Sequence, residues 1–310
     1  MIKVGGVIVK KKEKPYTYEF LEADLRKLAA DYGGVEWGSI GKSRWGRELF
    51  YIRLGHGKKK ISYNGAHHGM EWITSVLLMK FAGDYLSAEE QRGSLGGFSV
   101  EALSEKTSLY IIPMVNPDGV ELSATGRIPL WVGDKERKFL ESCNGSSNFG
   151  RWQANAAGVD LNHNYDALWE RSKALETEYG IYGPGATRFS GTAPFSEPES
   201  KALADFTIEK DFELAIAFHS QGKVIYQGFQ GKEPPLSLKI ARAFEKISPY
   251  RLEREEGIAS VGGYKDWFVE KMGRPGYTIE VGEGRNPLPT ESFPIIYKET
   301  LPVLVGAMTV

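Results

Sequence analysis

The chain alternates strand-like apolar runs with helical segments, and this alternation constrains the fold more than any other feature of the sequence. The strand candidates are rich in β-branched, aromatic and other apolar residues and occupy residues 35–40, 49–54, 60–66, 107–115, 213–218 and 276–281. The helix candidates, marked by apolar spacing or capping residues, occupy residues 17–30, 71–86, 196–209, 235–247, 264–272 and 294–308. The alternation predicts an α/β fold with a mixed, largely parallel twisted sheet and helices on both faces. Sites in such sheets lie beyond the carboxyl ends of the strands.

The connections between these segments carry further predictions. The polar, glycine-containing residues 41–48 predict a hairpin connection between the first two strands. Asn116-Pro117-Asp118-Gly119 has the chemistry of a turn that stops the strand at 107–115. Residues 119–195 show little periodicity, and long irregular segments inside compact domains are usually functional. No repeat or low-complexity linker divides the chain, so we expect one domain over residues 1–310.

The composition argues against several kinds of partner. Lys and Arg total 39 against 40 Asp and Glu, and the formal net charge of −1 does not suit a protein that binds nucleic acid or an anionic membrane through bulk positive charge. The most apolar stretch, residues 72–82, contains Lys80 and falls short of the roughly 20 residues that span a bilayer. At the N-terminus the apolar run 4–9 precedes its lysines, unlike a secretory signal. With Cys143 as the single cysteine, these features predict a cytoplasmic protein, with a secreted form already trimmed of its signal as the alternative.

Candidate metal ligands stand at the ends of the predicted strands. The histidines are His56, His67, His68, His163 and His219. His68 and Glu71 lie three residues apart at a loop-to-helix junction, so an imidazole and a carboxylate can turn to one point. His219 follows the strand at 213–218 and would complete a His₂Glu set of the kind that holds catalytic zinc with one position open for water. On the tetrapeptide alone, the more ordinary interpretation is a surface histidine beside a helix-capping glutamate.

Further motifs recur in order along the chain. They are residues 63–72 around the histidine pair, Ile40-Gly41-Lys42-Ser43 with Gly46-Arg47, Asn116-Pro117-Asp118-Gly119, Gly158-Val159-Asp160-Leu161-Asn162, residues 194–199, Phe218-His219-Ser220, Gly262-Gly263, Asp266-Trp267 and Thr278-Ile279-Glu280. In these motifs the sequence resembles the zinc carboxypeptidases of the carboxypeptidase A type, the M14 metallopeptidases. The resemblance covers about residues 35–281, which is nearly the whole chain.

The resemblance implies a zinc carboxypeptidase-like fold with one zinc ion per chain, held by His68, Glu71 and His219. It aligns Glu280 with the catalytic glutamate of the family. Zinc lowers the pKa of a bound water to about 7, and a nearby carboxylate can take the proton and return it to the leaving nitrogen. Asp160 aligns with the carboxylate that orients a zinc histidine from behind. Without the resemblance, Glu280 would be an ordinary surface carboxylate and Asp160 an Asx-turn residue.

The arginine that polarises the scissile carbonyl has two candidates. Arg151 precedes the segment at 158–162 as the family's arginine does, and its charge would stabilise a tetrahedral oxyanion. Arg127 is the alternative for this role, because the spacing between the arginine and the segment that follows it varies. We favour Arg151, for which the ordinary alternative is a surface arginine stacked on Trp152.

The sequence departs from ordinary carboxypeptidases at the positions that bind substrate. Those enzymes have Asn-Arg after GVDL, and the arginine grips the terminal carboxylate of the substrate. Here the pair is Asn162-His163, and a neutral imidazole lacks the planar fork of donors. The capping tyrosine of the family would fall near Ile258, and Tyr264 is the candidate to replace it, with a packing role as the equally ordinary alternative. Asn162, His163 and Tyr264 are therefore the predicted substrate-binding residues.

Two runs resemble the bacterial branch that includes the γ-D-glutamyl-L-diamino acid endopeptidases. They are His219-Ser220-Gln221-Gly222 followed by Ile225-Tyr226, and Arg151-Trp152 followed by Ala154-Asn155. Enzymes of this branch cut the bond between γ-D-glutamate and diaminopimelate in peptidoglycan stem peptides. The resemblance implies a zinc metallopeptidase acting on a peptide or peptidoglycan stem peptide, with His163 facing the diamino acid or a carboxylate of the peptide.

Three other functions stay in view. An exo-acting metallocarboxypeptidase shares every catalytic residue and differs in how it grips the terminal carboxylate. A small-molecule zinc amidohydrolase uses the same ligands but is not expected to carry the stretch at 262–267. A non-enzymatic module that binds wall peptides predicts a missing ligand or base, whereas His68, Glu71, His219 and Glu280 are all present.

Overall fold

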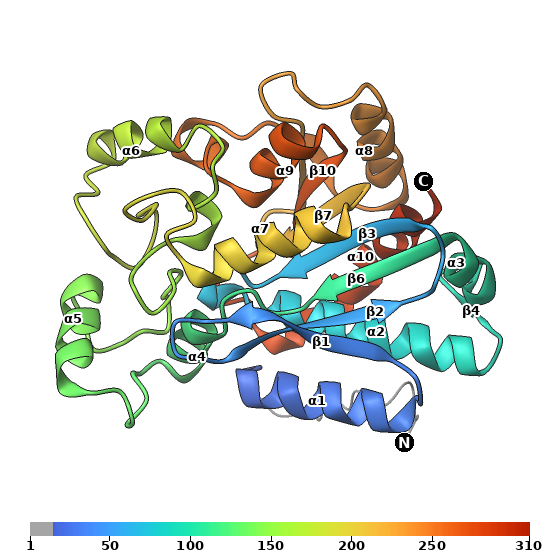
Figure 1. Cartoon of the computed structure of the whole chain (residues 1–310), viewed down its shortest axis with the longest axis horizontal. Helices are drawn as coiled ribbons and strands as arrows, with labels where there is room; N and C mark the ends of the chain where they lie inside the picture. The colour runs from blue at the N-terminus through green and yellow to red at the C-terminus, as the bar shows by residue number, and fades with distance from the viewer. Residues whose placement is uncertain (1–14) are drawn as a thin grey trace.

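A mixed sheet forms the centre of the molecule (Figure 1). The computed structural model describes residues 15–310, and within them eight strands have the order β1-β2-β6-β3-β7-β10-β8-β9. The strands are β1 Glu36–Lys42, β2 Glu48–Leu54, β3 Lys59–Gly65, β6 Thr107–Ile112, β7 Leu214–His219, β8 Val224–Gln227, β9 Arg251–Glu253 and β10 Gly276–Glu280. The pairs β3–β6, β3–β7, β7–β10 and β8–β9 are parallel, and β1–β2, β2–β6 and β8–β10 are antiparallel. The predicted mixed, largely parallel sheet is therefore confirmed.

Helices cover both faces of the sheet, as the alternation predicts. They are α1 Tyr18–Asp31, α2 Ile73–Glu90, α3 Val100–Lys106, α4 Pro117–Thr125, α5 Asp134–Asn144, α6 Trp169–Glu178, α7 Pro198–Lys210, α8 Leu236–Ile247, α9 Tyr264–Met272 and α10 Phe293–Thr309. Short 3₁₀ turns lie at Gly69–Glu71, Leu161–His163, Gly257–Ser260 and Thr290–Ser292, and a small separate hairpin pairs β4 Ser94–Leu95 with β5 Phe98–Ser99. The core on one face includes side chains of α1, α2, α3, α8 and α10, and the core on the other includes side chains of α7 and α9.

Strand β7 shows how one sequence serves both cores. Its side chains alternate across the sheet, as in any strand. Leu214, Ile216 and Phe218 pack in the core with α2 and α10, whereas the small Ala215 and Ala217 pack in the core with α7 and α9. All five are buried, which explains why the run is continuously apolar.

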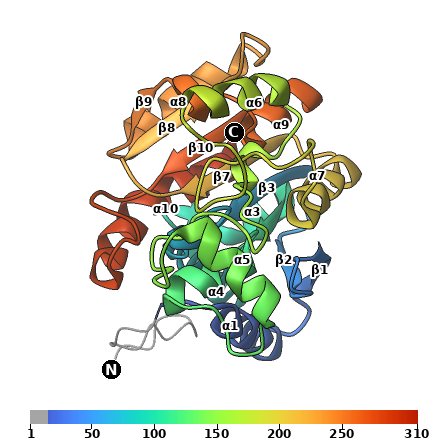
Figure 2. The same ribbon diagram turned by 90° about the vertical axis from the view of Figure 1, so that its left-hand side faces the viewer.

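The predicted turn at residues 116–119 is instead the start of a helix. Asn116 caps α4 because its side-chain oxygen accepts a hydrogen bond of 2.8 Å from the backbone N–H of Gly119, and Pro117 takes the first helical position. The same residue types favour turns and helix starts, so the sequence pattern did not separate the two. Helices α5 and α6 likewise interrupt the segment expected to be irregular, and both lie at one end of the molecule (Figures 1 and 2). The carboxyl ends of β3 and β6 point toward that end (Figure 1).

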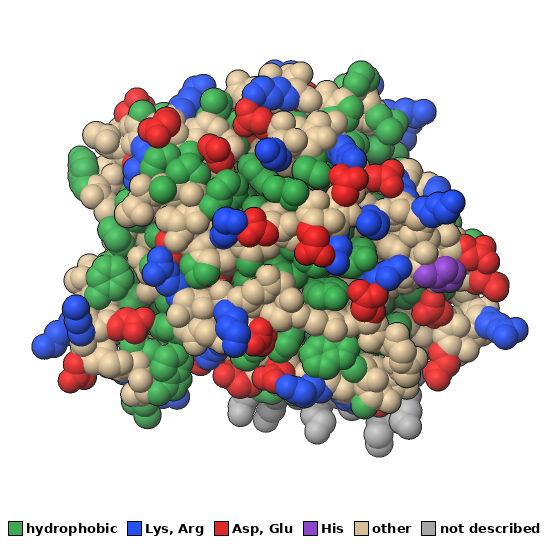
Figure 3. Space-filling model, in the orientation of Figure 1, with side chains coloured by type: hydrophobic (Ala, Val, Ile, Leu, Met, Phe, Trp, Pro, Cys, Tyr) green, Lys and Arg blue, Asp and Glu red, His purple; other side chains and the backbone are tan. Residues whose placement is uncertain are grey.

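The surface carries charges of both signs. On the face shown in Figure 3, basic and acidic side chains are interspersed, in keeping with the formal net charge of −1. None of the helices within residues 15–310 combines the length and hydropathy needed to cross a bilayer. The apolar run expected at residues 4–9 lies outside the described residues.

Candidate active site

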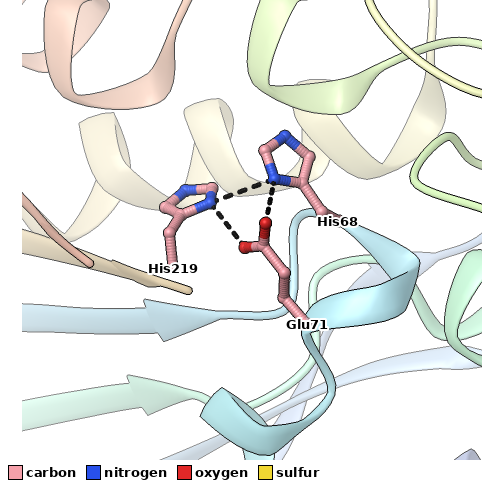
Figure 4. Close-up of side chains that lie close together, drawn as sticks. All are labelled: His68, Glu71 and His219. Atoms are coloured by element: carbon pink, nitrogen blue, oxygen red, sulfur yellow. Dashed lines mark hydrogen bonds and ion pairs between the residues drawn. The ribbon is translucent and has the colours of Figure 1, made fainter. Parts of the chain in front are cut away.

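Three side chains that can bind a metal converge at the carboxyl ends of β3 and β7 (Figure 4). His68 follows β3 in a short loop, Glu71 ends the 3₁₀ turn after it, and His219 is the last residue of β7. The two strands are parallel neighbours, with Gly65 opposite Phe218. This pairing brings Glu71 and His219 together although they are 148 positions apart in the sequence.

The spacing of these side chains fits a tetrahedral metal ion. Nδ1 of His68 lies 2.9 Å from Oε1 of Glu71, Nδ1 of His219 lies 3.0 Å from Oε2 of Glu71, and the two Nδ1 atoms are 3.2 Å apart. Two nitrogens at the usual 2.0–2.1 Å from a tetrahedral zinc ion would lie about 3.3 Å from each other. All three residues are buried. We call His68, Glu71 and His219 the metal triad.

Close backbone packing sets the position of the 3₁₀ turn. A Cβ atom on Gly69 would lie 2.3 Å from the carbonyl oxygen of Gly119 at the start of α4, so only glycine fits there. The N–H of Gly69 donates to the carbonyl of Gln153 over 2.9 Å. The side chain of Thr74 then accepts from the N–H of Ala66 and donates to the carbonyl of Glu71. These contacts fix the loop that carries His68 and Glu71.

Asp160 holds the His68 ring from behind. The Nε2–H of His68 donates to Oδ1 of Asp160 over 3.1 Å, which directs Nδ1 at Glu71 and His219. Asp160 is fully buried and accepts three more hydrogen bonds, from the N–H of Asn162 and Arg188 and from the side chain of Gln153. The predicted orienting position of Asp160 therefore matches its place in the structure.

The charges of the triad depend on one another. Burial works against the ionised Glu71 carboxylate, but His68 and His219 outweigh it and lower the pKa of Glu71 to about 2. Burial also works against the charged His68 ring, while Glu71 and Asp160 outweigh it and raise the pKa of His68. For His219 burial prevails and lowers its pKa. An ionised carboxylate between two imidazoles is a suitable donor set for a divalent metal.

Glu280 lies beside the triad at the end of β10. It is paired in register with His219 on the neighbouring parallel strand. Burial and the nearby Glu71 raise the pKa of Glu280 well above that of an ordinary glutamate. Its Oε2 atom is buried and has no hydrogen-bond partner among residues 15–310. A carboxyl group in this setting can exchange a proton with a reacting group.

The triad and Glu280 open onto a cleft of about 670 Å³. Arg151, Asn162 and His163 also line it, and their roles toward a substrate stay predictions. Arg127 is exposed beyond α4 and is not among the described residues that line the cleft, so the structure favours Arg151 as the arginine of the site. The Nδ1–H of His163 donates to the carbonyl of Val261 over 3.1 Å, which fixes the ring at the cleft wall.

Tyr264 does not line the cleft, which corrects its predicted role in substrate binding and agrees with the alternative of a packing role. Its side chain is fully buried against Tyr165 and Trp267, and its hydroxyl lies 3.0 Å from the hydroxyl of Thr207. The residue begins α9, and its N–H donates to the side-chain oxygen of Asn162. Ile258, at the position where the family carries its capping tyrosine, does line the cleft.

The sequence interpretation missed other residues of the cleft. Arg188, Arg254 and Glu255 line it, and Glu255 forms an ion pair of 2.5 Å with the buried Lys265. Burial raises the pKa of Glu255 to about 7 although Lys265 opposes the shift. These residues lie in loops, where no periodic pattern marks a functional side chain. The expectation that the irregular residues 119–195 are functional includes Arg188 but not Arg254 or Glu255.

Comparison with known proteins assigns the chain to a family. The zinc carboxypeptidase (peptidase M14) family model matches residues 21–303. The chain is 38% identical over 296 residues to γ-D-glutamyl-L-diamino acid endopeptidase 1 of Lysinibacillus sphaericus, covering 96% of this chain and 73% of that protein. It is 35% identical over 299 residues to the uncharacterized protein YqgT of Bacillus subtilis, covering 96% and 78%.

Solved structures share the fold at lower sequence identity. Thrombin activatable fibrinolysis inhibitor matches with a TM-score of 0.68 and 20% identity over 94% of this chain and 72% of that one. The murein-tripeptide amidase MpaA of Escherichia coli O157 matches with a TM-score of 0.52 and 18% identity over 91% and 95%. With a family model that spans nearly its whole length, the chain belongs to the M14 zinc carboxypeptidase family and is a zinc metallopeptidase.

Proposed function

We propose that this metallopeptidase cuts the amide bond between γ-D-glutamate and a diamino acid such as diaminopimelate in peptidoglycan stem peptides. The observation that carries the proposal is the 38% identity, over 96% of the chain, to a protein named for this bond. The departure at Asn162-His163 supports it, because both residues line the cleft where ordinary family members present an arginine.

The metal triad would hold one zinc ion, since its buried nitrogen and carboxylate donors and their spacing suit that metal. When bound, zinc supplies Lewis-acid chemistry, lowering the pKa of a water and polarising a carbonyl. Asp160 holds a proton of His68 on Nε2 and so would leave Nδ1 as the atom that binds the metal. Glu280 would take a proton at its carboxylate and give it to the leaving amine. Arg151 would stabilise negative charge that develops on the carbonyl oxygen.

His163 argues for a substrate other than an ordinary C-terminal residue. An arginine binds a carboxylate through two parallel N–H donors, whereas a neutral imidazole offers one. In this structure that one donor, Nδ1–H, is already bonded to Val261. His163 therefore has no N–H left for a terminal carboxylate while neutral, so the enzyme need not select a free C-terminus.

The test is hydrolysis of L-Ala-γ-D-Glu-meso-diaminopimelate by the zinc-loaded enzyme, followed by mass spectrometry. We expect release of diaminopimelate, and its loss in Glu280→Gln and after treatment with a chelator. Glu283→Gln is the matched control, because Glu283 is an exposed glutamate three residues further along the chain. An intact γ-linked peptide, with release of C-terminal residues from ordinary L-peptides, would instead support an exo-acting carboxypeptidase. A C-terminally amidated peptide separates the two modes, since an exopeptidase should lose most of its activity on it.

A further inference from the structure

Arg188 presents to the cleft a cation that pairs with no carboxylate of residues 15–310. Its exposed side chain lines the cleft, and its guanidinium lies 5.7 Å from the centre of the Tyr179 ring, which lines the cleft as well. Within residues 15–310 the guanidinium forms no ion pair, and it is the only charged group in residues 181–191. A guanidinium against an aromatic face keeps N–H donors in its plane for a second partner.

The backbone of Arg188 is fixed relative to the metal triad. Its N–H donates to Oδ2 of Asp160 over 2.9 Å, and Oδ1 of the same carboxylate accepts from His68. On either side, Thr187 donates to the side chain of Gln153 over 2.9 Å, and the carbonyl of Phe189 accepts from the N–H of Asp160 over 2.8 Å. Arg188 itself has a left-handed backbone with φ of 66°. The side chain of Arg188 therefore starts from a backbone that is held against the carboxylate that orients His68.

The other two arginines of the cleft are less suited to bind an anion of the substrate. Arg151 is the residue that we assign to the scissile carbonyl. Arg254 lies in residues 251–256, which also contain Arg251, Glu253, Glu255 and Glu256, so the segment has a formal charge of −1 with two arginines against three glutamates. Glu253 pairs with Arg251 and Glu255 with Lys265. Arg188 has no such neighbours in its own segment.

A γ-linked glutamyl residue carries, beside the scissile bond, an anion that an ordinary α-linked peptide lacks there. The residue is joined through its side-chain carboxyl group, so its α-carboxylate stays free, four carbon–carbon bonds from the scissile carbonyl carbon. We infer that Arg188 is a specificity-determining residue that binds this free α-carboxylate through its guanidinium. The inference rests on the proposed function and names the cation that would distinguish a γ-linkage from an α-linkage.

Two peptides that differ in one group test the inference. One is L-Ala-γ-D-Glu-meso-diaminopimelate, and the other has the α-carboxylate of the glutamyl residue converted to the carboxamide. We expect Arg188→Ala to lower kcat/KM about 10- to 100-fold on the first peptide, the range for a lost charge-assisted hydrogen bond, and less than about threefold on the second. Arg188→Lys should recover part of the loss, and Arg254→Ala, which removes a charge elsewhere in the cleft, should affect both peptides equally. The bond from Arg188 to Asp160 comes from the backbone, so these variants retain it.

Each other outcome has a defined meaning. Equal losses on both peptides in Arg188→Ala would show a structural role and overturn the inference while leaving the proposed function intact. A carboxylate-dependent loss in Arg254→Ala instead would also overturn it. If the wild-type enzyme cleaved neither γ-linked peptide, the proposed function would fail and the inference with it.

Discussion

Replacing Asp160 by asparagine should weaken both metal binding and folding. The carboxylate of Asp160 accepts four hydrogen bonds, from His68 and Asn162 at Oδ1 and from Gln153 and Arg188 at Oδ2, over 2.9–3.2 Å. An asparagine offers one oxygen and one NH₂ group, so in either orientation two donors around the buried side chain face the NH₂ group. Each hydrogen bond to a charged group contributes about 1.5–3 kcal/mol, so the free energy of unfolding should fall by about 3–6 kcal/mol.

The tautomer of His68 connects this change to the metal. If the asparagine NH₂ group faces His68, it favours a ring that accepts at Nε2 and carries its proton on Nδ1, the atom that must bind the metal. Loss of such a supporting carboxylate typically lowers metal affinity about 10- to 100-fold. Zinc affinity would be measured by competition with a chromophoric chelator, and stability by urea denaturation. Asp166→Asn, at a nearby exposed aspartate, is the control. An affinity within about threefold of wild type and a stability change under about 0.5 kcal/mol would refute the reasoning.

Three further changes have expected outcomes. Burial, reinforced by Asp118, raises the pKa of Glu199 from the usual 4.5 of a glutamate to about 8. Between these two pKa values the folded state holds a proton that the unfolded state releases, so the free energy of unfolding should decline as pH rises from 5 to 8, by at most about 1.4 kcal/mol per pH unit for this group. Glu199→Gln should flatten that decline in urea denaturation. An unchanged dependence of the free energy on pH would contradict the raised pKa of Glu199. Tyr264→Phe removes the hydrogen bond to Thr207, so the free energy of unfolding measured by thermal denaturation should fall by about 1 kcal/mol while kcat/KM stays unchanged. A tenfold fall in kcat/KM at normal stability would instead return Tyr264 to the substrate-binding residues. Removal of metal by a chelator should abolish hydrolysis and lower Tm, and added zinc should restore both; activity that survives full chelation would exclude a metal mechanism.

The sequence predicted those parts of the molecule whose pattern is local. Strand β7 is a continuous apolar run that ends at His219. Strand β3 also contains polar residues and ends at Gly65, three residues before His68. The ends of these two predicted strands therefore indicated the edge of the sheet that carries the site. Strands β8 and β9 contain only four and three residues and show no usable periodicity, and they were missed.

Side-chain direction was harder to predict than position. Tyr264 begins the helix that was predicted, but helical position does not decide whether an aromatic ring enters the core or the cleft; here it packs on Tyr165 and Trp267. Arg188 lies in a loop, and its place depends on hydrogen bonds with Asp160 that no sequence spacing encodes.

The pairing of β3 with β7 has a consequence for how the protein assembles. The ligands come from chain segments about 150 positions apart, so no short fragment of the chain contains the complete triad. Metal binding is then linked to the formation of the whole sheet, and contacts between such distant segments are slow to form. A metal that binds only the finished sheet stabilises it by about 4 kcal/mol at a free concentration a thousandfold above its Kd. The supply of zinc would therefore govern the lifetime of the folded enzyme as well as its activity.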